Sequence, residues 1–393
     1  MKKSTVAILA LLLTFTLLST QKTMVTHGQT EDRHYSLKST VTYSNPANGN
    51  FTWDFTEEDQ VISLFMNNSW QSVELKSATY GLSNLKYDED GNKIGLLELP
   101  KKQLLPGESL SFTTEHEIVE MPRTIPDLSE SESGVLNDIP SQLTQEYAAA
   151  EGTWSHTDPS IQELAHDIAG NQTKVMEITK ALIEWIRDNI NYTTHEIPLY
   201  AEQTVAAGVG DCDDQAILLI ALLRTLGIPS YLQIGAIYIP SRAEGPEDYW
   251  NNSLTIVEKR IGWHGWAVAY IPPWGWLPVD LTYVPEGLDN PLNAILQGAV
   301  TQQNTVQYMN ISKTDYIADS VESRSFLIDN GFQVQMEDEM TYLPQDSGVR
   351  GFNPFISAVL IAAIVAMSSL VVSMMMRRGR RKLKEKQKPM TEN

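Results

Sequence analysis

The sequence has 393 residues, with 29 Lys and Arg against 49 Asp and Glu, which gives a formal net charge of −20. A surface this acidic repels a phosphate backbone and therefore excludes a general nucleic-acid-binding protein. There is a single cysteine, Cys212, so an intrachain disulfide is excluded and the thiol needs another explanation.

The chain begins with an expected export signal. Lys2 and Lys3 precede an uncharged apolar run from Val6 to Leu18, which is short for a bilayer-spanning helix. We predict that residues 1–28 are a signal peptide or, if they are not cleaved, a signal anchor.

A strand-rich region follows, from residue 34 to residue 121. Stretches such as "HYSLKSTVTY" and "SVELKSATY" alternate apolar and polar residues between turn signals, a pattern typical of half-buried strands. This pattern predicts a β-sandwich domain. Within it, "DEDGN" at 88–92 is interpreted as an Asp-Gly hairpin turn, because its glycine is misplaced for a calcium loop and the closing Glu is missing.

The next segments are a predicted linker and a group of helices. Residues 122–146 are rich in Pro, Ser and acidic side chains, which favours a linker. Apolar spacing at 161–168 and 175–186 predicts two amphipathic helices. From 216 to 223 every residue is apolar, which indicates a helix that is buried on all sides.

Cys212 is predicted to occupy the first turn of this buried helix, with Asp211 as its N-cap. The helix dipole favours a thiolate there and offsets the nearby aspartates, but it contributes only about 0.3 to 1 kcal/mol at exposed sites. A histidine neighbour is therefore expected to have the larger influence. Asp213 and Asp214 are interpreted as solvated charges of the first helical turn.

Among the seven histidines, His264 lies on the predicted strand "WHGWAVAYI", and Asp280 lies on the strand that follows it. A hairpin turn around Pro273 with an even register places Asp280 directly or diagonally opposite His264, whereas an odd register separates them. The even register makes a triad available. In it Cys212 attacks an acyl carbon, His264 moves the protons and Asp280 holds the imidazole tautomer.

These segments carry a family resemblance. "GVGDCDDQAILLIALLRTLGIPSYLQIG" resembles the nucleophile helix of the transglutaminase-like superfamily, a papain-related group of cysteine acyl-transfer domains. "WHGWAVAYIPPWGWLPVDLTY" resembles its His and Asp strands, and "ALIEWIRDNINYT" its preceding helix. The resemblance covers residues 147–285 and implies an α+β domain in which Cys212 is the nucleophile, His264 the base and Asp280 the orienting carboxylate.

The resemblance has departures and leaves one role open. Val268 stands where the family commonly has an acidic residue four positions after the His, and Leu281 stands where a Pro commonly follows the Asp. The first change alters either substrate contacts or strand packing. For the oxyanion, the amide of Cys212 and the side chain of Gln203 are the two candidate donors.

Other interpretations of the same residues are weaker. A metal site of Cys212, Asp211, Asp213 and His264 has poor ligand spacing, so we expect no metal and no cofactor. Tyr192 either lines the cleft or is a packing residue. The tryptophans of the strand region are expected in the core and at its rim rather than in a sugar-binding platform; they are Trp263, Trp266, Trp274 and Trp276.

The C-terminal region contains an expected membrane span. Residues 286–350 hold either two more strands that pack on the catalytic domain or a juxtamembrane stalk. Residues 354–376 lack charged side chains and are predicted to form a transmembrane helix. The basic tail at 377–393 is expected in the cytoplasm by the positive-inside rule, which leaves the large middle region outside the cell.

The fold class predicted from the sequence is α+β: an N-terminal β-sandwich, a transglutaminase-like domain and a C-terminal transmembrane helix. The predicted function is that of a membrane-anchored extracellular cysteine acyl transferase or hydrolase, which cleaves peptide or isopeptide bonds of extracellular or envelope proteins through a thioester. The alternatives are a protein-glutamine cross-linking transglutaminase and a non-catalytic binding or scaffold module of the same fold.

Overall fold

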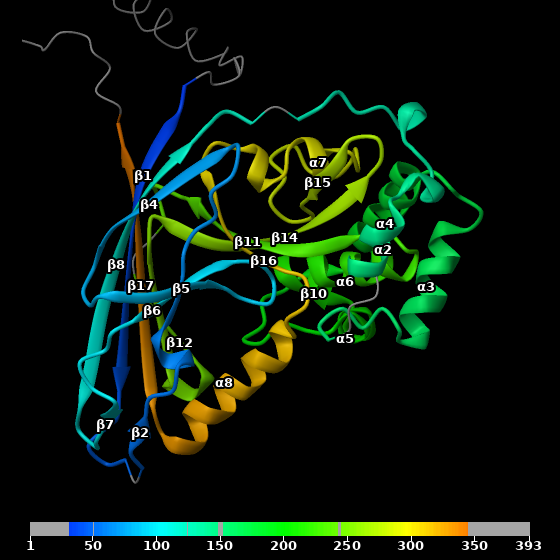
Figure 1. Ribbon diagram of the computed structural model, residues 1–393. Coiled ribbons are helices and arrows are strands. Elements are labelled where there is room, and N and C mark those ends of the chain that lie inside the picture. Colours follow the sequence, from blue (N-terminus) through cyan, green and yellow to red (C-terminus); the bar gives the residue numbers. More distant parts are fainter. Residues whose placement is uncertain (1–30, 50, 124, 148–151, 243–244, 345–393) are drawn as a thin grey trace, which may run out of the picture. The chain divides into compact units, whose positions relative to one another are not determined.

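The computed structural model describes residues 31–49, 51–123, 125–147, 152–242 and 245–344 (Figure 1). The predicted signal segment at 1–28, the membrane span at 354–376 and the basic tail at 377–393 lie outside the described residues. Within the described ranges, no helix combines the length and the apolar character that a membrane span requires.

The largest sheet has six strands in the order β12-β13-β17-β1-β8-β4. Their bounds are β1 (Arg33–Ser44), β4 (Gln71–Ala78), β8 (Ser109–Glu120), β12 (Pro246–Tyr249), β13 (Leu254–Lys259) and β17 (Gln333–Leu343). β1 lies between β8 and β17 and is antiparallel to both, with Leu37 opposite His116 on one side and Met340 on the other. The sheet therefore joins strands from both ends of the described chain, which Figure 1 shows in blue and orange.

The β-sandwich predicted for residues 34–121 is not confirmed. Its long strands β1, β4 and β8 belong to the six-stranded sheet, while its short strands form a separate three-stranded sheet, β3-β6-β5, and a two-stranded pair, β2-β7. The alternation itself is real, since buried and less buried residues alternate along β8. Alternation shows which face of a strand is buried, but it does not specify the partner strand.

A second sheet has four antiparallel strands in the order β15-β14-β11-β16. These are β11 (Ser230–Tyr238), β14 (Ile261–Ile271), β15 (Gly275–Val279) and β16 (Thr305–Ile311). The remaining short strands are β2 (Trp53–Asp54), β3 (Val61–Ser63), β5 (Leu82–Tyr87), β6 (Lys93–Leu97), β7 (Gln103–Leu104), β9 (Asn191–Tyr192) and β10 (Val209–Gly210). β16 and β17 both come from the 286–350 region, whose described part, 286–344, also contains the helices α7 (Asn293–Leu296), η5 (Ala299–Thr301) and α8 (Tyr316–Asn330).

Most of the helices, among them α3, α4, α5 and α6, gather on one side of the four-stranded sheet, whereas α7 lies beside β15 (Figure 1). The α-helices are α2 (Ser141–Tyr147), α3 (Pro159–Ala169), α4 (Val175–Asn189), α5 (Ala201–Ala207), α6 (Cys212–Thr225), α7 (Asn293–Leu296) and α8 (Tyr316–Asn330). The 3-10 helices are η1 (Glu58–Gln60), η2 (Glu130–Glu132), η3 (Leu136–Asp138), η4 (Trp250–Asn252) and η5 (Ala299–Thr301). α6 is the central helix, because it contacts β14 and β11 on one side and α3, α4 and α5 on the others.

α6 is buried on all sides, as its unbroken apolar run predicts. Every residue from Asp214 to Arg224 is buried, and the small residues Ala267 and Ala269 of β14 belong to the same core. Arg224 is the one basic residue in this stretch. Its guanidinium lies 4.3 Å from the ring centre of Trp154 and donates to the carbonyl oxygen of Ser230, and burial lowers its pKa to about 9.

The stretch predicted as a linker, 122–146, contains two 3-10 helices and most of α2, and it is hydrogen-bonded to the turn after β14 and to the segment before α4. The amide of Gly134 donates to the carbonyl oxygen of Pro272 at 2.7 Å, and the amide of Leu136 donates to that of Thr173 at 2.9 Å. A Cβ atom at Gly134 would lie 2.9 Å from Pro272, so this close approach requires glycine. The segment thereby braces the turn between β14 and β15.

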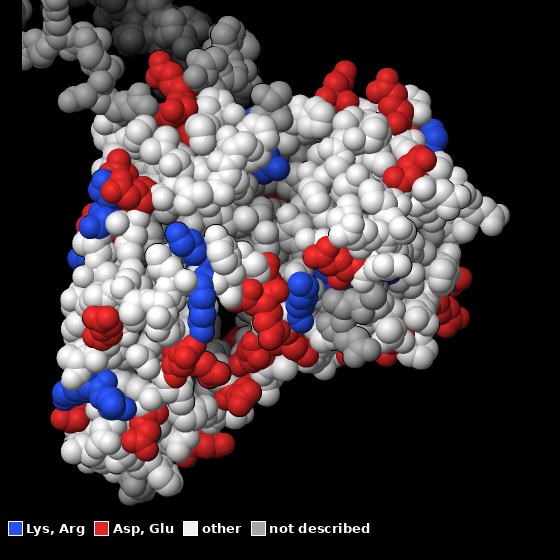
Figure 2. All heavy atoms as spheres, viewed as in Figure 1, with Lys and Arg blue, Asp and Glu red and all other residues white. Residues whose placement is uncertain are grey.

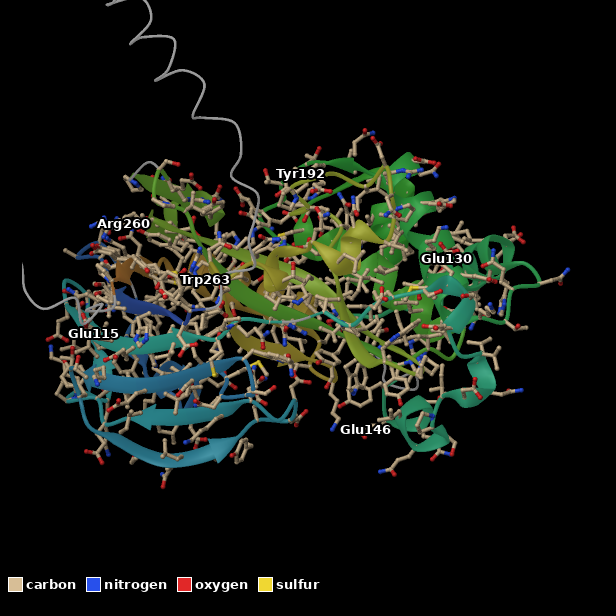
Figure 3. All side chains as sticks on the ribbon, turned by 90° about the horizontal axis from the view of Figure 1, so that it is seen from above. Glu115, Glu130, Glu146, Tyr192, Arg260 and Trp263 are labelled. Atoms are coloured by element: carbon tan, nitrogen blue, oxygen red, sulfur yellow. The ribbon has the colours of Figure 1, made fainter. Side chains whose placement is uncertain are left out.

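A second apolar core fills the space between the two large sheets. Leu37 and Ile118 enter it from the six-stranded sheet, and Ala236 and Val306 enter it from the four-stranded sheet. Trp263 lies at this boundary (Figure 3), and other aromatic side chains of this core are Phe65 and Tyr308. The indole Nε1 of Trp263 donates to Asp338 Oδ2 at 2.9 Å, which adds a polar link between β14 and β17.

The predicted hairpin turn at 88–92 is confirmed. The amide of Asp88 donates to the carbonyl oxygen of Asn92 at 3.0 Å, between β5 and β6. Asp90 Oδ1 accepts hydrogen bonds from the amides of Ser312 and Lys313 at 2.8 and 2.6 Å. The N-terminal hairpin therefore anchors the loop that leads into α8.

Acidic side chains gather around a hollow on the face shown in Figure 2. Asp319 of α8 lies near the carboxylates of Asp315, Glu322, Glu58 and Asp90. Burial, and after it the repulsion from these charges, raises the pKa of Asp319. Part of the strong negative charge of the chain is thus concentrated around α8.

Candidate active site

Cys212 is the first residue of α6, as the sequence predicts. Asp211 precedes it as the N-cap residue, and Asp214 Oδ2 accepts a hydrogen bond from the Asp211 amide at 3.1 Å. The thiol is partly buried, and the backbone amide of Gly265 lies near enough to favour its charged form. The sulfur therefore lies against β14 at the residue that directly follows His264.

The surroundings of the sulfur favour the protonated thiol. Burial foremost, and then the charge of Asp213, raise the pKa of the Cys212 thiol, while the amide of Gly265 acts in the opposite direction. The expected offset by the helix dipole is therefore too small. An ion pair with a protonated imidazole is the stronger way to stabilise a thiolate here.

His264 and Asp280 are brought together by the register of β14 and β15. Val268 pairs with Pro278 and Ala267 pairs with Val279, so the even register is the one observed and Asp280 follows the strand end diagonally from His264. The distance from His264 Nε2 to Asp280 Oδ2 is 2.9 Å. Both side chains are buried.

The Asp280 carboxylate is held from three sides. Its Oδ1 accepts from the amides of Thr282 and Tyr283, each at 3.0 Å, and its Oδ2 accepts from the amide of Ala299 at 2.8 Å. A Cβ atom at Gly298 would lie 2.6 Å from Asp280 Cβ, so the chain passes too close for any larger residue. These contacts fix the carboxylate in the position that orients the imidazole.

The two departures from the family pattern have structural explanations. Val268 is 5 % exposed and packs with Trp266 and Val300, so this position contributes to strand packing rather than to a substrate contact. Leu281 is partly buried against the core around α6. Neither residue disturbs the hydrogen bond between His264 and Asp280.

Tyr192 lies at the opening of the site, a placement that the sequence left undecided. It ends β9, which pairs in parallel with β10 directly before α6, with Tyr192 opposite Gly210. Its side chain is 58 % exposed and lies at the margin of the molecule in Figure 3. Burial of part of the ring, and then the negative groups at Cys212 and Asp211, raise the pKa of Tyr192 to about 12.

Gln203 is not placed as an oxyanion donor, which corrects that expectation. It is exposed on α5, and its Oε1 accepts a hydrogen bond from the amide of Tyr200 at 3.2 Å. Its side chain therefore caps the short helix α5. The pattern that indicated Gln203 was its position upstream of Cys212, which carries no information about the direction of the side chain.

Asp214 is also different from the expectation of a solvated charge. It is fully buried, and its Oδ1 accepts from the amide of Leu199 at 2.6 Å. Its Oδ2 lies 2.8 Å from Nδ1 of His195. Asp214 therefore ties α6 to the 193–200 loop, a contact that local sequence patterns do not reveal.

Tyr316 is the residue near the site that sequence reasoning missed. It begins α8, about a hundred positions after Cys212, and its hydroxyl donates to Asp213 Oδ2 at 3.3 Å. Burial, followed by the charges of Asp213 and Cys212, raises the pKa of Tyr316 well above its usual value. No local pattern around Tyr316 indicates this position.

Two clusters of side chains bring potential metal ligands close together. Potential ligand atoms of Asp211, Cys212 and Asp213 lie within 4.8 Å of one another, and so do those of His195, Asp211 and Asp214. His264 belongs to neither group, and its Nε2 faces Asp280 instead. In the second group the atoms of His195 and Asp214 already bond to each other, so we assign neither group as a metal centre.

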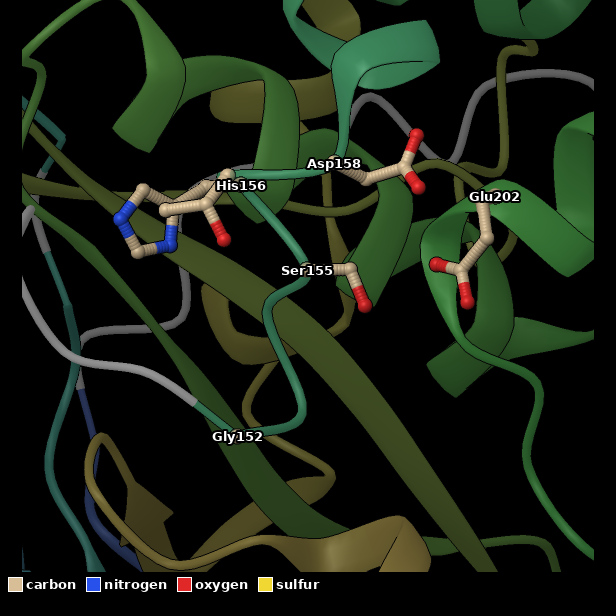
Figure 4. A pocket seen from close by; sticks show the side chains of 6 residues that line it. Gly152, Ser155, His156, Asp158 and Glu202 are labelled. Carbon is tan, nitrogen blue, oxygen red and sulfur yellow. The ribbon is translucent and has the colours of Figure 1, made fainter.

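A cavity of about 420 Å³ lies elsewhere, between the loop before α3 and the start of α5. The described residues that line it are Gly152, Ser155, His156, Thr157, Asp158 and Glu202. The Asp158 carboxylate points toward Glu202 across this space (Figure 4). None of the three proposed triad residues lines it.

The tryptophans are packing residues, as expected. Trp266 is 1 % exposed, and its Nε1 donates to Gln233 Oε1 at 3.2 Å. Trp276 packs among the rings of Tyr147, Tyr231 and Tyr270. Trp263, Trp274 and Trp276 are partly buried and pack against the apolar cores.

Comparison with known proteins identifies the class of the central domain. Residues 162–281 match the model of the transglutaminase-like superfamily, and they include α6, β14 and the residue after β15 that bears the Asp280 carboxylate. This part of the chain is therefore a transglutaminase-like superfamily domain within a mixed α+β fold. A search among curated proteins gives no match.

Solved structures support the same fold. A candidate cysteine protease from Cytophaga hutchinsonii is similar with a TM-score of 0.50 and 16 % identity, covering 80 % of this chain and 92 % of that chain. A candidate protease from Parabacteroides distasonis has a TM-score of 0.24 with 10 % identity, covering 72 % and 68 % of the two chains. Red sea bream transglutaminase has a TM-score of 0.29 with 9 % identity, covering 65 % and 47 %. The fold assignment relies on the first of these structures.

Proposed function

We propose that the protein is a cysteine-dependent acyl transferase or hydrolase that cleaves amide bonds through a thioester. Cys212 is the nucleophile, His264 the general base and Asp280 the carboxylate that orients it. The observation that carries the proposal is the 2.9 Å contact between His264 and Asp280, together with the position of the next residue, Gly265, beside the sulfur of Cys212.

His264 and Asp280 have separate roles in the proton transfers. Asp280 faces Nε2 of His264, so Nδ1 is the ring nitrogen available to exchange a proton with the thiol. Transfer of the thiol proton to Nδ1 creates a thiolate and an imidazolium, whose positive charge is stabilised by Asp280. This internal pairing is needed because burial otherwise favours the neutral thiol.

The thiolate then attacks the carbonyl carbon of a peptide or isopeptide amide. The imidazolium returns its proton to the leaving nitrogen, the C–N bond breaks, and the acyl group remains on Cys212 as a thioester. The amide of Cys212 at the N-terminus of α6 is a donor suited to the developing oxyanion. His264 then removes a proton from the acceptor, which adds to the thioester and releases the thiol.

Water as the acceptor gives hydrolysis, and a primary amine gives cross-linking. The site chemistry is the same in both, so protein-glutamine cross-linking is the second candidate function. We favour hydrolysis of an extracellular or envelope protein or peptide. The membrane anchor and outward location expected from residues 1–28, 354–376 and 377–393 stay predictions.

The test uses a glutamine-containing peptide library with and without a labelled primary amine. Wild-type protein is expected to release free amine or ammonia and leave a carboxylic acid, and Cys212→Ala is expected to lose this activity completely. Incorporation of the label in place of acid would instead support the cross-linking function. Asp167→Asn on the exposed face of α3 serves as a charge control that keeps wild-type activity.

A catalytically inactive scaffold makes the opposite prediction. In that case no peptide or amine substrate is turned over, and iodoacetamide labels Cys212 at rates that do not change in His264→Gln. Equal alkylation profiles of wild type and His264→Gln between pH 5 and 9 would therefore remove the support for the ion pair.

A further inference from the structure

Two carboxylates flank the sulfur in the first turn of α6. Asp211 is the N-cap residue and Asp213 follows Cys212. One oxygen from each carboxylate and the sulfur lie within 4.8 Å of one another. If both carboxylates were ionised, a nucleophile that must become negative would face two negative charges at short range.

The oxygens of the Asp211 and Asp213 carboxylates differ in whether they accept a hydrogen bond. Asp211 Oδ2 accepts from the amide of His195 at 3.2 Å, and Asp213 Oδ2 accepts from the hydroxyl of Tyr316 at 3.3 Å. Asp211 Oδ1 is buried and has no hydrogen-bond donor among the described residues. A buried carboxylate oxygen without a donor is costly, so a donor for this atom has to be found.

The carboxyl group of Asp213 is a candidate donor, because one of its oxygens lies within 4.8 Å of an oxygen of Asp211. We propose that Asp213 carries a proton and donates it to Asp211 Oδ1, so that one negative charge rather than two lies beside Cys212. The hydroxyl of Tyr316 holds the other oxygen of Asp213 in place. A shared proton of this kind is the usual result when two carboxyl groups meet in a buried site.

The surroundings of Asp213 are consistent with a neutral carboxyl group. Burial first, and then contact with Asp211, raise the pKa of Asp213 well above its usual value. The titratable groups that face this part of α6 come from the helix itself and its N-cap, from β9, from α8 and from the 193–200 loop. They are Asp211, Cys212, Asp214, Tyr192, Tyr316 and His195.

The proton has a consequence for the nucleophile. While Asp213 is neutral, the thiolate of Cys212 is opposed by the charge of Asp211 alone. When Asp213 loses its proton at alkaline pH, a second charge appears beside the sulfur and thiolate formation becomes harder. Asp213 therefore acts through Cys212 as a positioning residue, and the relevance of this role rests on the proposed function.

The experiment measures the alkylation of Cys212 by iodoacetamide in the full chain from pH 5 to pH 10. Cys212 is the only cysteine, so no other thiol contributes. The variants are Asp213→Asn, whose amide can donate to Asp211 Oδ1 as the protonated carboxyl group does, and Asp211→Asn, which removes the remaining charge. Asp167→Asn is the matched control on an exposed helix face.

At pH 7 we expect Asp213→Asn and the control to react at the wild-type rate within about twofold, and Asp211→Asn to react about tenfold faster. Above the pH at which Asp213 titrates, wild type should fall behind Asp213→Asn. A rise of about tenfold in Asp213→Asn at pH 7 would mean that Asp213 is already ionised, which overturns the proposal. A rate that changes with divalent cations and reverts with EDTA would also overturn it, because a bound cation would then satisfy Asp211.

A second measurement covers the case in which Asp213→Asn folds poorly in a urea titration. Carbon-13 NMR of aspartate-labelled wild-type protein is expected to find a protonated carboxyl group at pH 7, which disappears only at alkaline pH. A complete set of ionised aspartates at pH 7 would refute the proposal. The turnover assay separates failure of this proposal from failure of the proposed function. A protein that turns over no peptide or amine substrate can still give the expected alkylation and NMR results.

Discussion

His116 makes folding stability sensitive to acid. It lies on β8 opposite Leu37 and Leu75, is 3 % exposed, and its ring centre is 5.1 Å from that of Phe65. Neither ring nitrogen has a hydrogen-bond partner among the described residues. Burial lowers the pKa of His116 from 6.5 to about 4, so the folded state holds this ring neutral.

The size of this effect on the free energy of unfolding follows from the linkage between protonation and folding. The unfolded chain takes up the proton near pH 6.5, while the folded chain resists it until about pH 4, so the stabilising contribution is present above pH 6.5 and is lost as the pH falls toward 4. A difference of about 2.5 pKa units at 1.36 kcal/mol each corresponds to about 3 kcal/mol in total. About 2 kcal/mol of this should already be lost at pH 5.

The assay is urea unfolding followed by tryptophan fluorescence at pH 7 and pH 5. Other groups also titrate in this range, so the informative quantity is the difference between wild type and His116→Leu. We expect His116→Leu to gain about 2 kcal/mol relative to wild type on going from pH 7 to pH 5. His166→Leu, on the exposed face of α3, is the control and should follow wild type. An identical pH dependence of wild type and His116→Leu would refute the reasoning.

Three further predictions concern the site and its supports. Asp280→Asn should lower kcat by roughly 10²- to 10⁴-fold, because the imidazole loses its orienting charge, and should also destabilise the protein by about 1–3 kcal/mol, because one of the amides that donate to the carboxylate loses its acceptor; an unchanged kcat in a peptidase assay would contradict this. Gly298→Ala should reduce kcat, because the added Cβ displaces Asp280. Gly245→Ala is the control and should keep kcat, because an added Cβ there meets nothing within 4 Å. Equal kcat values for the two variants would argue against the close contact at Gly298. Asp90→Ala should destabilise the protein by about 2 kcal/mol in urea unfolding, because the amide of Ser312 loses its acceptor. A loss below about 0.5 kcal/mol, the low end for a hydrogen bond, would show that the contact is dispensable.

The residues that local sequence patterns identified are those whose neighbours are close along the chain. The apolar run after Cys212 specifies a buried helix, since a helix with no polar face has to be enclosed. The tight turn between β14 and β15 limits the register, and the even register brings Asp280 to His264. For these elements a short sequence separation leaves few alternative geometries.

The remaining features were decided by contacts between distant segments. β17 pairs with β1, which lies nearly three hundred residues away in the sequence. The residues of a strand do not by themselves specify which other strand it pairs with. Tyr316 reaches Asp213, and His195 reaches Asp214, only because α8 and the 193–200 loop pack against α6. The sequence by itself determined the buried helix that begins at Cys212 and the hairpin that brings Asp280 to His264, where the chain is locally constrained. Only the tertiary structure decided which strands pair and how the charges around Cys212 are balanced, because backbone partners and burial depend on how the whole chain packs.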